Sequence, residues 1–157
     1  MRSRDFDSYI QALAAPILEP MGFTSEGGRG CTFRRKLTDD LYHFVQFEPS
    51  KKGEQFEVWV FLGTMLLGPE QWKNFPDFVG VPTGRLAALN AKLGVGHGGS
   101  RFPCRDKAGL VAAFAAAVRP ALETHVEPYL AQFATVTSII PHLEHPHWAA
   151  LLARSGS

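Results

Sequence analysis

The first stretch of the chain has the apolar spacing of an amphipathic helix, with apolar residues three or four positions apart on one helix face. These residues are Phe6, Ile10, Leu13 and Ile17. Asp5 and Asp7 near its start suit the positive end of a helix dipole. Because proline lacks an amide hydrogen and clashes with the turn before it, we expect Pro16 to disrupt the last turn. We expect Pro20 and Gly22 to end the helix, after which a turn leads to a sheet.

The apolar spacing then changes to the two-residue period of β-strands. Three alternating segments, 31–37, 41–49 and 54–63, predict three strands joined by two hairpins. Gly53 supplies the positive φ that a short turn commonly requires. Side chains alternate between the two faces of a strand. In the third segment one face has Phe56, Val58, Val60 and Leu62, and the other has Glu57, Trp59 and Phe61.

The region that follows is the least regular part of the chain. Residues 64–105 contain several prolines and many glycines. Within this region the spacing predicts a helix over 83–94. The segment 95–104 is typical of a loop, with room for a short edge strand.

A long helical pattern begins at Asp106, with apolar residues every three or four positions. They are Leu110, Phe114, Val118, Leu122, Val126, Leu130 and Phe133. This spacing predicts a core-facing helix that is kinked or broken at Pro120 and Pro128. A shorter helix is expected over 146–153.

Together these elements predict an α+β fold, in which an N-terminal helix and C-terminal helices pack on an antiparallel β-meander sheet of three to five strands. The chain has 157 residues, of which 45% are hydrophobic and 20% are charged, as in an ordinary globular protein. We therefore expect a single domain over residues 1–154 and a disordered tail over 155–157.

Charge and cysteine content narrow the function classes. The formal net charge is +1, so no global field attracts the protein to nucleic acid or to an anionic membrane, and neither partner is expected. Cys31 and Cys104 have no CxxC spacing, which excludes a zinc ribbon and indicates reduced thiols in a cytoplasmic protein. No apolar stretch approaches the length of a membrane-spanning helix. No cofactor is predicted.

Several motifs together resemble a known bacterial family. They are PILEPMGF, a Phe-Arg-Arg strand, VQFEPSKKGEQFEVWVFLG and HVEPYLAQF. Over residues 10–63 and 106–133 the chain resembles the domain of unknown function 4304 family. The resemblance implies an α+β fold and brings no established activity, cofactor or catalytic residue.

One face of the predicted sheet is a candidate binding surface. If Phe56 and its neighbours pack on the helices, the opposite face carries Trp59 and Phe61. The neighbouring strands add Tyr42, Phe44 and Gln46, and then Arg34 and Lys36. Aromatic residues beside arginine are typical of interface hot spots. Two readings stay open: residues 64–105 cover this face as a second core layer, or the face is a groove, dimer interface or partner surface.

Two loops hold further candidate residues. His97 lies in a glycine-rich segment that lacks the strand-loop-helix context of a phosphate-binding loop, although His97 and Arg101 are placed to line a pocket mouth. His142, His145 and His147 lie within six positions and have the ligand chemistry of a zinc, copper or nickel site. A surface loop before a terminal helix explains the same histidines without a metal.

The leading hypothesis is a non-catalytic binding or protein-interaction domain of a bacterial cytoplasmic protein, with a protein partner or a homodimer. It rests on the lack of a recognisable catalytic motif. The alternative is a small enzyme with a pocket near Arg34, His43, Trp59, His97 and Arg101. A thiolate-imidazole pair of Cys104 and His97 lacks an orienting third group, so Cys104 is expected to be a buried structural thiol.

Overall fold

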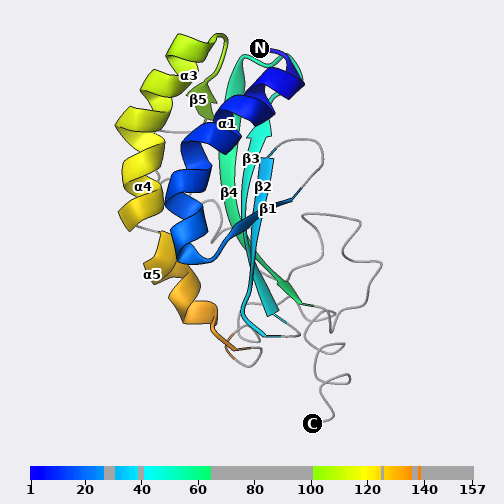
Figure 1. The fold of residues 1–157 in the computed structure, drawn as a ribbon, viewed down its shortest axis with the longest axis vertical. Coiled ribbons are helices and arrows are strands. Elements are labelled where there is room, and N and C mark those ends of the chain that lie inside the picture. Colours follow the sequence, from blue (N-terminus) through cyan, green and yellow to red (C-terminus); the bar gives the residue numbers. More distant parts are fainter. Residues whose placement is uncertain (27–30, 39–40, 65–100, 125, 136–137, 139–157) are drawn as a thin grey trace.

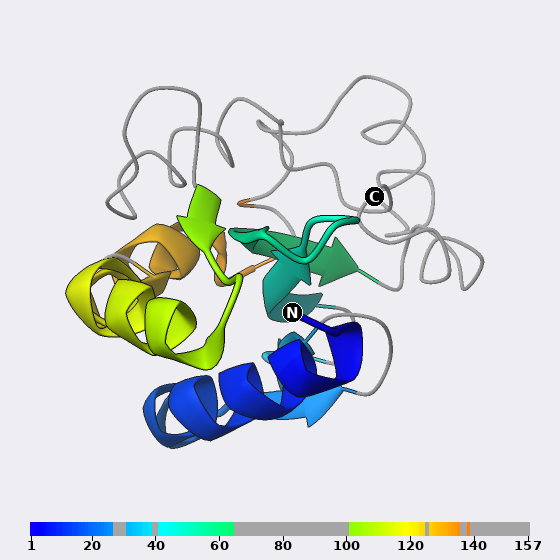
Figure 2. The same ribbon diagram turned by 90° about the horizontal axis from the view of Figure 1, so that it is seen from above.

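The computed structural model describes residues 1–26, 31–38, 41–64, 101–124, 126–135 and 138. These residues form two layers, a five-stranded antiparallel sheet and a layer of helices (Figures 1 and 2). The predicted α+β fold, with an N-terminal helix and C-terminal helices on an antiparallel meander, is confirmed.

Helix α1 spans Ser3–Leu18 and packs one side on the sheet. Its buried residues are Phe6, Ile10, Ala14, Ile17 and Leu18. The prediction for Pro16 was wrong, because the helix continues through it. Pro16 lies on the exposed side of the helix, where its ring meets solvent. A 3₁₀ turn over Glu19–Met21 then leads to Gly22, whose φ of 94° ends the helical region.

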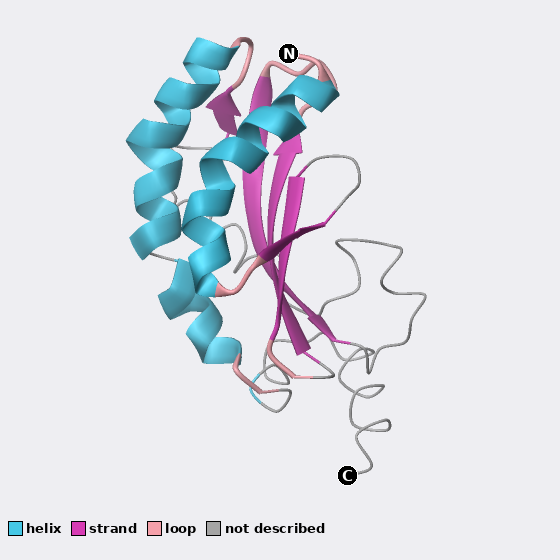
Figure 3. Cartoon of the chain, viewed as in Figure 1, coloured by secondary structure: helices cyan, strands magenta, loops and turns pink. Residues whose placement is uncertain are grey.

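The strands, drawn in magenta in Figure 3, follow one another in the sheet in chain order, β1-β2-β3-β4-β5. Their bounds are β1 Thr24–Glu26, β2 Cys31–Lys36, β3 Leu41–Pro49, β4 Gln55–Thr64 and β5 Arg101–Pro103. The three predicted strands are confirmed as β2, β3 and β4. β1 was missed, because it is short and has no apolar alternation. β5 is the short edge strand for which the segment 95–104 left room.

The strand register decides which side chains share a face. Val45 lies opposite Val60, and Phe47 lies opposite Val58. These four side chains are fully buried against the helices. Gln46 lies opposite Trp59, so this pair faces away from the helices, as the alternation predicted.

The C-terminal helical run follows the predicted apolar positions but is divided into segments. They are α3 Lys107–Ala113, a π-helical turn Phe114–Val118, α4 Arg119–Thr124, α5 Val126–Leu130 and a 3₁₀ turn Ala131–Phe133. The Asp106 carboxylate caps α3 by accepting from the amide of Gly109 at 2.7 Å. The wider π turn ends at Val118, two residues before Pro120, the position at which a kink was predicted. Pro128 lies in the first turn of α5, where a missing amide hydrogen costs no helical bond.

Aromatic rings from both layers meet in one core between the helices and the sheet. Phe56 lies between Phe6 and Phe102, with ring centroids at 5.4 and 5.3 Å. Phe47 stacks on Phe114 of the C-terminal run at 6.3 Å. The core thus fixes both helical regions to the same face of the sheet.

Some predictions fall outside the described residues. They are the helices over 83–94 and 146–153 and the tail over 155–157. Among the helices that the structure does describe, none is both long and apolar enough to cross a membrane.

Candidate functional site

The sheet face turned away from the helices is called the distal face. Its described side chains include Thr32, Arg34, Lys36, Tyr42, Phe44, Gln46, Glu48, Gln55, Glu57, Trp59 and Arg101. The predicted residues Arg34, Tyr42, Trp59 and Arg101 all lie on this face. Phe61 lies on β4, opposite Phe44 of β3, but the structure does not describe the side chain of Phe61.

One end of the distal face combines a cation with aromatic rings. The Arg34 guanidinium lies over the Tyr42 ring, 5.2 Å from its centroid. The Tyr42 and Phe44 rings are 6.4 Å apart. Phe44 is only 2% exposed, whereas Arg34 and Tyr42 are half-buried. The accessible part of this end is therefore the arginine with the tyrosine beside it.

Trp59 lies in the middle of the same face and is half-buried. Its indole nitrogen Nε1 is buried and has no hydrogen-bond partner within the described part of the chain. A buried donor without an acceptor is costly in free energy. Because Nε1 has almost no exposed surface, the part of Trp59 that a partner can contact is its ring and not this N–H.

The opposite end of the distal face contains a cavity of about 290 Å³. Glu48 and Glu57 lie directly opposite each other on β3 and β4. Arg101 on β5 donates from Nε to the Glu57 carboxylate at 3.1 Å. Both glutamates and Arg101 line the cavity, with Lys51 and Gln55 at the hairpin end. Arg101 thus lines a cavity, while the predicted pocket mouth of His97 and Arg101 stays a prediction, because His97 lies outside the described residues.

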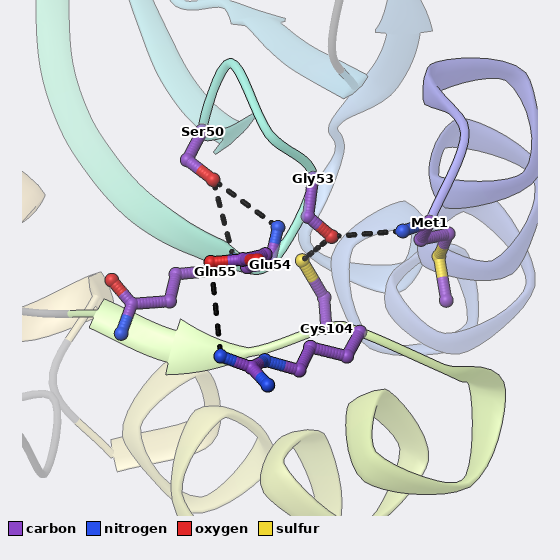
Figure 4. Close-up of polar contacts among 7 residues, drawn as sticks. Met1, Ser50, Gly53, Glu54, Gln55 and Cys104 are labelled. Carbon is purple, nitrogen blue, oxygen red and sulfur yellow. Dashed lines mark hydrogen bonds and ion pairs between the residues drawn. The ribbon is translucent and has the colours of Figure 1, made fainter.

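The hairpin beside the cavity is held by a dense set of hydrogen bonds (Figure 4). The Ser50 hydroxyl accepts from the amides of Glu54 and Gln55, both at 3.3 Å. Gly53 has a φ of 68° and its carbonyl accepts from the Met1 ammonium at 3.0 Å. The Cys104 amide donates to the Glu54 carbonyl at 2.9 Å, which joins the hairpin to the chain after β5. These hydrogen bonds therefore hold the backbone of the hairpin that forms one wall of the cavity.

The opposite, helix-covered face holds a separate polar cluster around Arg35. Its guanidinium donates to the Met21 carbonyl at 3.0 Å and to the Glu127 carboxylate at 2.6 Å. It also donates from Nη2 to His43 Nδ1 at 2.8 Å, which requires that nitrogen to be an acceptor. The same group lies 4.6 Å from the centroid of the Phe23 ring.

His43 is therefore placed differently from the predicted enzyme pocket. It is 1% exposed and lies on the helix-covered face, whereas Arg34, Trp59 and Arg101 lie on the distal face. The sheet itself separates His43 from these three residues. The enzyme hypothesis that grouped all of them in one pocket was wrong about His43.

Both thiols are buried and are not activated nucleophiles. Burial raises the pKa of Cys31 to about 12, and the nearby Asp7 carboxylate adds to the shift. Burial also raises the pKa of Cys104, whose Sγ donates to the Gly53 carbonyl at 3.5 Å. A thiolate is the reactive form, so the expected structural role of Cys104 is supported by its surroundings.

The remaining predicted site residues fall outside the described residues. They are His97 and the three candidate metal ligands His142, His145 and His147. Within the ranges that the structure does describe, no group of three or more histidine, cysteine or acidic residues is arranged to hold a metal ion.

The sequence prediction missed Glu48, Glu57 and Lys51 as part of a site. The signal was present in the pairing register, because hairpin strands of known length place Glu48 opposite Glu57. The contribution of Arg101 was not predictable in this way, because its strand follows a long connection.

Comparisons with protein-family models, curated proteins and solved structures found no match to this chain.

Proposed function

We propose that this protein is a non-catalytic binding module that recognises a protein partner through the distal face. The observation that supports this most is the Arg34–Tyr42 pair on the same face as the half-buried ring of Trp59. Arginine, tyrosine and tryptophan are the residues most enriched at interface hot spots.

The chemistry of the other candidate groups also favours binding. The two described thiols are buried and have a raised pKa, and His43 is engaged by Arg35 beneath the helices. The polar groups of the distal face are instead partly exposed, as a recognition surface requires. The resemblance to the domain of unknown function 4304 family, the bacterial origin and the cytoplasmic location stay predictions.

Partner capture with matched variants tests this proposal. Wild type, Arg34→Ala and Trp59→Phe would be compared in capture from the native cell lysate. Trp59→Phe keeps an aromatic ring and removes only the indole N–H with part of the ring area. Arg119→Ala is the control, because Arg119 is an exposed arginine on α4.

We expect a protein that is retained by wild type and by Arg119→Ala, and that is reduced with both distal-face variants. Circular dichroism would verify that all four proteins are folded. Sedimentation of each protein alone would show whether the partner is a second copy of the chain. Equal retention by all four proteins would contradict the proposal.

A further inference from the structure

We propose that the cavity at the hairpin end of the distal face binds a small zwitterionic molecule of amino-acid or dipeptide size. This inference goes beyond the proposed function, since it names a different class of ligand for the opposite end of the same face. The cavity volume of about 290 Å³ lies at the lower limit of the roughly 300 to 1,000 Å³ typical of small-molecule sites. A compact ligand therefore suits it better than a drug-sized one.

The arrangement of the two glutamates favours a cationic group. Like charges directly opposite each other on neighbouring strands destabilise a sheet. Glu48 and Glu57 form such a pair. Arg101 forms an ion pair with the Glu57 carboxylate at 3.1 Å. Among the described residues no ion pair joins a cation to Glu48. An ammonium group in the cavity would relieve the remaining repulsion.

The cations at the cavity favour a carboxylate at the other end of the ligand. Arg101 donates a hydrogen bond from Nε to Glu57, and its side chain is 65% exposed. Its terminal nitrogens have the geometry to bind a carboxylate. Lys51 adds a second positive charge on the hairpin. With two carboxylates and two cations, the lining matches a ligand that carries one charge of each sign.

The walls of the cavity are formed before any ligand arrives. The Ser50 hydroxyl and the positive φ of Gly53 fix the turn, and the Cys104 amide fixes the chain after β5 to Glu54. Because these backbone groups are already ordered, binding costs little conformational entropy in the hairpin.

A nuclear magnetic resonance titration of the full chain with three related probes tests the inference. Glycylglycine carries both charges, N-acetylglycylglycine lacks the ammonium, and glycylglycinamide lacks the carboxylate. We expect glycylglycine to cause saturable shifts at the amides of residues 48–51, 55–57 and 101. Each blocked probe should bind at least about three-fold more weakly, as the loss of one exposed ion pair predicts. Shifts that do not saturate, or equal binding of all three probes, would overturn the inference.

Glu48→Gln separates a binding role from a structural one. It removes the like-charge repulsion, so stability should stay equal or rise, while the dissociation constant for glycylglycine should increase by about three- to five-fold. Glu123→Gln on the exposed side of α4 is the control and should change neither quantity. Unchanged affinity in folded Glu48→Gln would overturn the inference. If the titration fails while partner capture still depends on Arg34, only this inference is lost and the proposed function stands.

Discussion

At the scale of single residues, Arg35 connects β2 to three other parts of the fold. From β2 it reaches the turn after α1, β3 and α5 through Met21, His43 and Glu127. Its side chain is 17% exposed, so these bonds form in a partly desolvated place. Strand alternation placed Arg34 on the candidate binding face, but nothing in the sequence indicated that its neighbour Arg35 contacts three other elements.

Arg35→Met should lower the free energy of unfolding by about 2 to 4 kcal/mol, because it leaves His43 Nδ1 buried without its donor. Urea denaturation measures this change. Arg119→Met on the exposed surface of α4 is the control and should stay within about 0.5 kcal/mol of wild type. A loss for Arg35→Met as small as that of the control would contradict a structural role for the cluster.

Cys31 should make stability depend on alkaline pH. Its pKa is about 12 in the folded protein, against an ordinary value of 9.0. Below pH 9 the thiol is protonated in both states, and its contribution to stability is fully present. As the pH rises from 9 toward 12, only the unfolded chain loses the proton, so this contribution is lost.

The stability difference between wild type and Cys31→Ala should therefore shrink above pH 9, by at most about 1.4 kcal/mol per pH unit. Urea denaturation at several pH values between 7.5 and 10.5 measures it. The comparison with Cys31→Ala cancels the titration of lysines and tyrosines. A difference that stays constant over this range would show that the thiol is not kept protonated by burial.

At the scale of elements, Pro16 lowers the stability of α1, and another residue at this position would avoid that loss. A proline inside a helix removes one hydrogen bond and strains the turn before it, at about 3 kcal/mol. Core contacts of the buried residues on the other side hold the helix together across this position. The sequence prediction judged Pro16 by its local effect and missed the stabilisation from tertiary packing.

Pro16→Ala should raise the free energy of unfolding by about 1 to 2 kcal/mol, since it restores the amide hydrogen and removes the ring clash. Part of the gain is offset by the greater freedom of the unfolded chain. Pro20→Ala is the matched control, because Pro20 lies near the start of a 3₁₀ turn where proline is tolerated. We expect that control to be neutral or slightly destabilising. A loss of stability in Pro16→Ala would contradict this account of α1.

Elements with a strong period were predictable, and those without one were not. β2, β3, β4 and the C-terminal helical run followed from alternation or helical spacing. β1 did not, because three residues of Thr-Ser-Glu carry no apolar signal. The π turn before Pro120 also has no sequence signature of its own.

At the scale of the whole molecule, the described helices lie on one face of the sheet, opposite the distal face (Figure 2). Strand alternation predicted which residues face which way, and the register confirmed it. Alternation does not report how much of a face is covered. Phe44 is nearly fully buried on the distal face, while Arg34, Tyr42 and Trp59 are half-buried.

The distal face is the recognition surface that we propose for this protein. Site-specific photo-cross-linking in the native lysate tests it most directly, with benzoylphenylalanine at position 42 on the distal face and at position 116 on the exposed side of the helical layer. Our account predicts a discrete cross-linked protein from position 42 that is absent from position 116 and is lost when Arg34→Ala is added. The same products from both positions, or products from position 116 alone, would contradict it.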